Sequence, residues 1–253
     1  MVRGIEIFKR WFAGHEGQYV IIGGTACDLL MDDAGLEFRA TKDIDLVLIV
    51  EALDAAFGKR FWEFIQTAGY QRKTKSSGSP QFYRFANPKD NDYPAMIELF
   101  SRKPDAISLP TDAVLSPLPL EEDISSLSAI LLDEDYYRFL MQGRIQTDGV
   151  TILDAPYLIP FKAKAWIDLS KKKENGESID ERNIGKHKND IFRLSELLTE
   201  DIKMSALLPS SVKEDMRYFL NMMRIGRSDL AQLGIRYRSK DDILDALIRI
   251  YLE

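Results

Sequence analysis

Cysteine and histidine are scarce in this sequence, and their scarcity excludes several kinds of site. Cys27 is the only cysteine, so the chain cannot form an internal disulfide. The only histidines are His15 and His187, and no cluster of His and Cys suggests a zinc site. With two histidines, no Ser-His-Asp arrangement can be singled out either. We expect Cys27 to be a small buried residue, and His187, which stands between two lysines, to lie at the surface.

Long apolar runs are also missing. No run approaches the roughly 18 to 20 residues that a membrane span needs, so we expect no membrane partner. The first residues, MVRGIEIFKRWF, are typical of an amphipathic helix and lack the apolar core of a signal peptide, so we expect a cytoplasmic protein. The composition, 45% hydrophobic and 29% charged, is typical of a soluble globular protein. The net charge of −6 argues against a general nucleic-acid coat protein.

Two common phosphate-binding motifs are absent. The lack of G-x-x-x-x-G-K-[ST] excludes a P-loop, and the lack of G-x-G-x-x-G disfavours a Rossmann site. The sequence has instead Gly23-Gly24-Thr25, between the apolar run Tyr19 to Ile22 and a helix-like segment. Glycines let the backbone approach a phosphate, and a helix N-terminus presents free N–H groups to it. The same residues are also typical of a tight turn in which Thr25 is the helix N-cap.

A pair of acidic residues stands at the start of the next apolar run. In Asp43-Ile44-Asp45, the period of a strand places both aspartates on one face, roughly 7 Å apart. From Leu46 to Val50 the run is apolar on both faces, which is typical of a central strand. Two carboxylates at the mouth of such a strand repel one another unless a cation lies between them. Mg²⁺ suits this position, since it takes carboxylate oxygens and leaves coordination sites for phosphates.

A third acidic residue, Glu98, lies on a later predicted strand, between two apolar residues of the same face. A carboxylate in such surroundings needs a cation or a proton. Together Asp43, Asp45 and Glu98 fit the two-metal chemistry of phosphoryl transfer, in which Glu98 faces the acceptor hydroxyl. The alternative is that Glu98 lies at a sheet edge in a salt bridge with Lys or Arg.

A longer pattern joins these residues: Gly23-Gly24-Thr25, a loop, and then Arg39-x-Thr41-x-Asp43-Ile44-Asp45. This pattern resembles the nucleotidyltransferase (polymerase-beta-like) superfamily and, more narrowly, the AbiEii/AbiGii toxin type. The resemblance covers about the first 100 residues, with a weaker echo from residue 160 to 198. It implies that the three acidic residues are catalytic and hold Mg²⁺, as two ions.

The resemblance also implies where an NTP binds. Its phosphates are expected at Gly23, Gly24 and Thr25. Arg39 and Lys42 flank the acids, where either can neutralise phosphate or pair with a nearby carboxylate. Members of this branch also carry a Lys on the first helix after the catalytic domain and a basic-Asp pair on a later helix. The matching residues here are Lys162 or Lys164, then Lys188 and Asp190. The alternative is that these charged residues belong to a solvated helix face.

Hydrophobic periodicity divides the chain near residue 155. Residues 1–155 are predicted to be a catalytic domain of the α+β class, with a mixed sheet flanked by helices, and residues 156–253 a helical subdomain. The expected strands of the first part are residues 19–22, 43–50, 81–86, 93–101, 127–132 and 150–154. Its expected helices are residues 5–12 and 53–68; residues 133–141 are a helix or an edge strand, and 105–123 a loop. In the second part, helices are expected near residues 160–170, 183–198, 211–223, 228–233 and 240–252.

The expected function is an Mg²⁺-dependent nucleotidyltransferase that moves a nucleoside monophosphate from an NTP to a hydroxyl and releases pyrophosphate. By resemblance, the acceptor is a tRNA or a protein, and the chain is the toxin of a toxin–antitoxin pair with a separate antitoxin protein. Two alternatives stay open. One is a degenerate domain that binds NTP or a partner protein without catalysis, and the other is a small-molecule (antibiotic) nucleotidyltransferase. The sequence names neither the base nor the acceptor.

Overall fold

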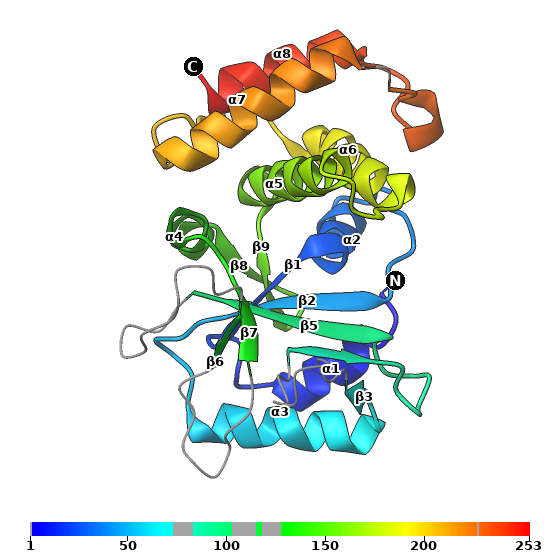
Figure 1. Cartoon of the computed structure of the whole chain (residues 1–253), viewed down its shortest axis with the longest axis vertical. Helices are drawn as coiled ribbons and strands as arrows, with labels where there is room; N and C mark the ends of the chain where they lie inside the picture. The colour runs from blue at the N-terminus through cyan, green and yellow to red at the C-terminus, as the bar shows by residue number, and fades with distance from the viewer. Residues whose placement is uncertain (1, 73–82, 103–114, 118–127, 227) are drawn as a thin grey trace.

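A computed structural model gives the fold and describes residues 2–72, 83–102, 115–117, 128–226 and 228–253. Within these residues the chain forms a mixed sheet flanked by helices, followed by a helical part (Figure 1). The α+β class predicted from the sequence is therefore confirmed. In the part of the chain that is described, no helix has the length and apolar character to cross a membrane.

From the start of the chain to β9 the elements are both helices and strands. The described elements after β9 are all helices. The strands are β1 (Tyr19–Ile22), β2 (Asp43–Leu48), β3 (Gln71–Arg72), β4 (Arg84–Ala86), β5 (Met96–Ser101), β6 (Leu115–Pro117), β7 (Ser128–Leu131), β8 (Arg144–Thr147) and β9 (Val150–Leu153). The helices are α1 (Ile5–Phe12), α2 (Gly23–Asp33), α3 (Ala55–Ala68), α4 (Glu134–Gln142), α5 (Ala155–Glu174), α6 (Glu181–Leu194), α7 (Ser210–Ile225) and α8 (Lys240–Tyr251). Two short 3₁₀ helices are η2 (Ser195–Leu197) and η3 (Ala231–Leu233).

The strand that carries the acidic pair lies inside the sheet, as its apolar faces predict. The strand order is β3-β4-β5-β2-β1-β9-β8, with β7 beside β5 and β6 beside β7. Strand β2 runs antiparallel to β1 and parallel to β5. After Asp45 its side chains are fully buried on both faces of the sheet, which leaves only its first residues open to a ligand.

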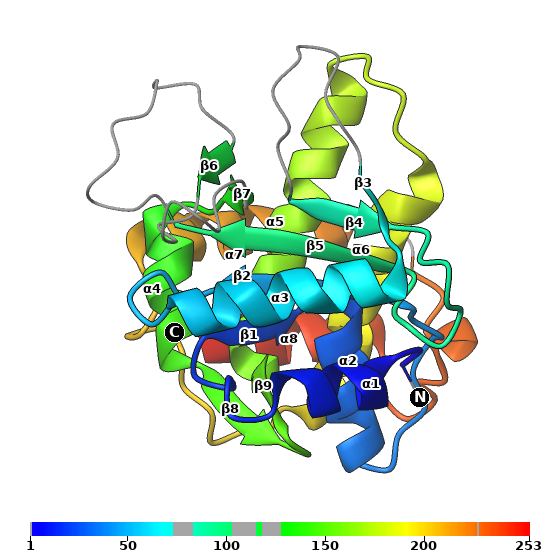
Figure 2. The ribbon, with the colours of Figure 1, turned by 90° about the horizontal axis from the view of Figure 1, so that it is seen from below.

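Helices cover both faces of the sheet. Helices α1 and α3 lie across one face (Figure 2), and α2 lies on the other, with α5 and α6 packed over α2 and with α7 and α8 outermost (Figure 1). Under α1 and α3 the core is aromatic: the ring centroid of Phe12 lies 5.4 Å from that of Phe64 and 6.1 Å from that of Phe61. One apolar core continues from α1 to α8, so the helical part is packed firmly onto the layer that carries the acids.

The differences from the predicted elements are local. Residues 133–141, for which helix and edge strand were both open, form the helix α4. The helix predicted at 228–233 is wrong, since the described part of this segment forms only the 3₁₀ turn η3. The predicted loop at 105–123 falls outside the described residues except for β6, which is a strand. Strand β8 has no predicted counterpart, and α5 begins earlier than predicted, at Ala155.

Helix α5 continues through a proline, and a tyrosine from the last helix makes this possible. In a regular helix the N–H of residue 160 would bind the carbonyl of residue 156, but Pro160 has no N–H. The hydroxyl of Tyr251, which is fully buried, donates to the Pro156 carbonyl at 2.7 Å. This bond satisfies the carbonyl that the proline leaves without a helical partner, and it ties α8 to the start of α5.

We expect Tyr251→Phe to destabilise the protein by about 1–2 kcal/mol, because it leaves the buried Pro156 carbonyl without a donor. The measurement is urea unfolding at pH 7. The matched control is Tyr218→Phe, since Tyr218 is 41% exposed and loses only a solvated hydroxyl. Equal unfolding midpoints for the two variants would show that the Tyr251 hydrogen bond contributes nothing.

Candidate functional site

The three predicted carboxylates lie on one face of two neighbouring strands, β2 and β5. Strands β2 and β5 are parallel neighbours, and their register places Asp45 opposite Glu98 and Asp43 opposite Met96. Directly opposite residues of two paired strands point to the same face of a sheet, and so do residues i and i+2 of one strand. Asp43, Asp45 and Glu98 therefore lie on one face, which is the face that α2 covers.

The surroundings of Asp45 strongly shift the pKa of its carboxyl group. Its pKa is raised from its ordinary value of 3.8 to about 6, first because the side chain is desolvated and then because Glu98 and Asp43 repel its charge. The positive charges of Lys162 and Lys186 lower the pKa of Asp45, but by less than desolvation and the two carboxylates raise it. Among the described residues, no side chain donates a hydrogen bond to the Asp45 carboxylate. The position thus favours a cation that the protein itself does not supply.

Glu98 already has a cationic partner. Arg84, on β4, donates its Nε to Glu98 Oε1 at 2.7 Å, and its Nη2 contacts the same oxygen. This is the salt bridge foreseen as an alternative, although Glu98 lies on an inner strand and not at a sheet edge. No three Asp, Glu, His or Cys side chains of the described chain are grouped to hold one metal ion. A metal ion bound jointly by Asp43, Asp45 and Glu98 would therefore require Glu98 to turn away from Arg84.

The close packing around Gly23 and Gly24 leaves no room for a side chain at either position. Gly23 opens α2 with a φ of 72°, and a β-carbon there would lie 2.0 Å from Asp45 Oδ2. A β-carbon on Gly24 would lie 2.9 Å from Thr41 Oγ1 and 3.2 Å from an Arg39 nitrogen. Glycine at these positions lets the N-terminus of α2 approach the carboxylates closely. Any anion bound there would meet the free N–H groups of that helix end.

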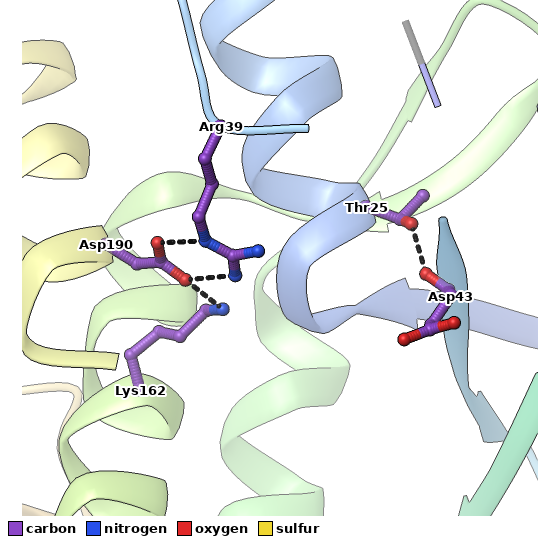
Figure 3. Close-up of polar contacts among 5 residues, drawn as sticks. All are labelled: Thr25, Arg39, Asp43, Lys162 and Asp190. Carbon is purple, nitrogen blue, oxygen red and sulfur yellow. Dashed lines mark hydrogen bonds and ion pairs between the residues drawn. The ribbon is translucent and has the colours of Figure 1, made fainter. Parts of the chain in front are cut away.

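Thr25 has a different role from the predicted cap. The N-cap of α2 is Ile22, which makes no side-chain capping bond, so the alternative in which Thr25 is the N-cap does not hold. The Thr25 hydroxyl donates instead to the backbone carbonyl of Asp43 at 2.6 Å (Figure 3). Because Thr25 is fully buried, this bond fixes the start of β2 against α2 and so positions the acidic pair.

We expect Gly23→Ala to destabilise the protein by about 1–3 kcal/mol more than Gly149→Ala does. Both glycines have positive φ, but a β-carbon at Gly149 meets nothing within 4 Å, whereas one at Gly23 strikes Asp45. The control therefore separates backbone strain from the clash. The measurement is urea unfolding of the two variants. If both lose the same stability, Asp45 is free to move away from Gly23.

A buried ionic cluster joins the sheet to the helical part beside this site. Arg39 donates its Nε and Nη2 to the two carboxylate oxygens of Asp190, at 2.9 and 2.8 Å, and Lys162 Nζ donates to Asp190 Oδ2 at 2.8 Å (Figure 3). Asp190 is fully buried and Lys162 is 3% exposed. Three of the residues predicted to bind nucleotide thus bind one another, across 151 positions of the sequence for Arg39 and Asp190.

The protonation states in this cluster are fixed by its pairing. Burial would raise the pKa of Asp190, but Lys162 and Arg39 outweigh it and hold that pKa below its usual range. Burial would likewise lower the pKa of Lys162, yet the net shift is upward beside the Asp190 carboxylate. Cys27 packs against this cluster fully buried, as predicted, and burial raises its thiol pKa to about 12. All three are therefore locked in one charge state near neutral pH.

The remaining predicted nucleotide ligands lie elsewhere. Lys164 Nζ is 3.3 Å from Asp215 Oδ2 on α7, so it faces the outer helices. Lys188 lines a groove with Trp166 and other residues of α5 and α6. Lys42 is exposed beside the acids. The structure thus brings Lys162, Arg39 and Asp190 together and leaves Lys164 and Lys188 outside the group.

Two residues of α6 that were not assigned to the site lie near it. Lys186 is exposed, and its charge opposes the upward pKa shift of Asp45, so it lies on the acid-facing side. Lys186 stands four residues before Asp190, which is one helical turn, whereas Lys188 points roughly 160° away from Asp190.

His187 is not the surface residue that was predicted. Its Nδ1 is buried without a partner among the described atoms. Burial, together with the charges of Lys162 and Lys186, lowers the pKa of His187 to about 3.

Searches of protein-family models, of curated proteins and of solved structures gave no match to this chain. The carboxylates, the glycine turn and the basic residues around them are therefore the features from which a function can be inferred.

Proposed function

We propose that this protein is an Mg²⁺-dependent nucleotidyltransferase, which moves a nucleoside monophosphate from an NTP to a hydroxyl acceptor. The observation that carries the proposal is the placement of Asp43, Asp45 and Glu98 on one face of two parallel strands, against the glycine-rich start of α2. A carboxylate whose pKa is raised to about 6, first by desolvation and then by neighbouring carboxylates, favours a proton or a cation beside it. Such a strand pair beside a helix N-terminus can hold both a metal and phosphates.

Asp43 and Asp45 are the residues that would hold Mg²⁺, and when bound the metal would neutralise charge on the phosphates of the NTP. The Gly23-Gly24 turn places backbone N–H groups where the triphosphate would lie. Lys186, which is exposed and faces the acids, is the side chain best placed to add positive charge there. We assign this role to Lys186 in place of Lys188.

Glu98 is the group nearest to Asp45 that can accept a proton from the acceptor hydroxyl. In the present arrangement one of its oxygens is held by Arg84. Arg84 is 36% exposed, so its side chain can leave Glu98 without uncovering a core position. This pairing holds Glu98 in one orientation until the acceptor reaches it.

A labelling experiment can identify the acceptor. The protein is incubated with Mg²⁺ and each α-labelled NTP in turn, together with total cell RNA, a protein extract or an aminoglycoside mixture. Label on RNA or protein, lost in Asp43→Asn, is the expected result and agrees with the toxin role that the sequence resemblance implies. Label on the aminoglycosides alone would assign the chain to small-molecule modification instead.

The Arg84–Glu98 pair also favours a second candidate, a domain that binds NTP without transferring it. If Arg84 holds Glu98 permanently, the three carboxylates never act together. In that case Mg²⁺·NTP raises the melting temperature but no acceptor is labelled. The variant Arg84→Gln separates the two candidates further, since only a transferase changes its rate when Glu98 is released.

A further inference from the structure

A pocket lies away from the three carboxylates of the proposed active site, between the helical part and the segment before β2. Its volume is about 480 Å³, which is within the usual range for small-molecule sites. Residues from three separate stretches line it: Phe38 and Arg39 from the segment before β2, Arg193 from α6, and η3 with the residues after it, ending at the buried Ile235. None of the three carboxylates of the proposed active site belongs to this lining.

Among the described ion pairs around this pocket, none includes Arg193. Arg39, Lys162 and Arg193 lie close together, and the buried carboxylate among them is that of Asp190, which Arg39 and Lys162 already share. Of the acidic residues in the lining, Glu196 contacts Arg238 and Glu37 is exposed. Within the described residues, Arg193 has no carboxylate in ion-pair contact, although it is half-buried. Desolvation lowers the pKa of Arg193 and the like charge of Arg39 adds to it, while the nearby Asp190 carboxylate opposes the shift without overcoming it.

Arg193 is also held in position by an aromatic ring. Its guanidinium carbon lies 5.7 Å from the ring centroid of Phe38, and that of Arg39 lies 5.2 Å from the same centroid. Phe38 therefore presents two cations to the pocket while adding apolar surface of its own. Ile235 and Met31 supply further apolar wall. The combination of a fixed guanidinium and an apolar lining selects a ligand that has both an anionic group and an apolar body.

We propose that this pocket binds a small organic anion, whose carboxylate or phosphate pairs with Arg193 while its apolar part lies against Phe38 and Ile235. The site is distinct from the proposed NTP site, because its ligand does not need Asp43, Asp45 or a metal ion. It shares only Arg39 with the ionic cluster beside that site.

Calorimetric titration of the whole protein with phenyl phosphate, benzoate and inorganic phosphate tests the proposal, with benzyl alcohol as the neutral probe. We expect phenyl phosphate or benzoate to bind more tightly than inorganic phosphate, and benzyl alcohol not to bind. Arg193→Gln should weaken binding about tenfold or more. The matched control is Arg217→Gln on α7, which removes an exposed arginine outside the pocket and should leave the affinity unchanged.

Two further variants guard against ambiguous results. Ala231→Trp fills the pocket from an exposed position and keeps every charge, so it should abolish binding even if Arg193→Gln is poorly folded. Asp45→Asn should bind the aromatic anion as the wild type does. The proposal is overturned if neither aromatic anion binds at millimolar concentration, if Arg193→Gln and Ala231→Trp bind normally, or if Asp45→Asn loses binding.

Discussion

Replacing Asp45 with asparagine should abolish nucleotide transfer and leave the protein folded. Asparagine keeps the size and hydrogen-bonding capacity of the side chain but removes the negative charge that attracts a cation. We expect the rate to fall on the order of 10³-fold or more, because phosphoryl transfer depends on positioned charge. The measurement is transfer from labelled NTP at saturating Mg²⁺.

The same variant should gain stability at neutral pH in metal-free buffer. The folded-state pKa of Asp45 is raised from 3.8 to about 6, so the ionised side chain destabilises the folded state above pH 6. Asp45→Asn removes this effect and should raise the free energy of unfolding on the order of 2–3 kcal/mol at pH 7. The gain should shrink as the pH falls from about 6 to about 4, and it should vanish below about pH 4, where the wild-type carboxyl is protonated in both states. A variant that is less stable at pH 7 and still active would show that Asp45 is structural.

Replacing Asp190 with asparagine should give the largest loss of stability. The change leaves the buried Lys162 and the partly buried Arg39 without their carboxylate, and broken buried ion pairs of this kind are destabilising by about 3–5 kcal/mol. The matched control is Asp215→Asn, which removes a carboxylate with 20% exposure that lies 3.3 Å from Lys164. We expect about 1 kcal/mol or less for that control, because solvent screens the pair.

Urea unfolding of the two variants measures this difference. Lys162→Met should fall between them, since Asp190 then keeps its two hydrogen bonds from Arg39. Equal losses for Asp190→Asn and Asp215→Asn would mean that the buried cluster does not hold the helical part to the sheet. In that case the charge of Asp190 would not be needed for the fold.

Strands could be predicted from the sequence where the pattern of apolar and polar residues along one segment shows which of its faces are buried. The alternation in Asp43-Ile44-Asp45, followed by residues apolar on both faces, correctly indicated an inner strand with two acids on one side. Glu98 shares this face because of the register between β2 and β5. The sequence shows only the alternation of residues along the strand that carries Glu98, and not this register. The catalytic roles of these three residues stay predictions.

The side-chain partners could not be predicted, because they depend on packing between distant segments. Arg84 meets Glu98 only through the pairing of β4 with β5, and Arg39 meets Asp190 only once α6 packs beside α2. On α6 itself, a choice between Lys186 and Lys188 requires the rotation of the helix, which charge spacing alone does not give. Phe38, Arg193 and the pocket between them left no sequence signal, since each residue is ordinary in its own segment.

The central claim is that the carboxylate site performs transfer and does not merely bind NTP. The most direct test measures both properties on one preparation of the wild-type protein: the rise in melting temperature with Mg²⁺·NTP, and label transferred from α-labelled NTP to components of a cell extract. The proposal predicts both a rise in melting temperature and transferred label, with the label lost in Asp45→Asn. A clear rise in melting temperature with no label on any component, for any of the NTPs, would contradict it.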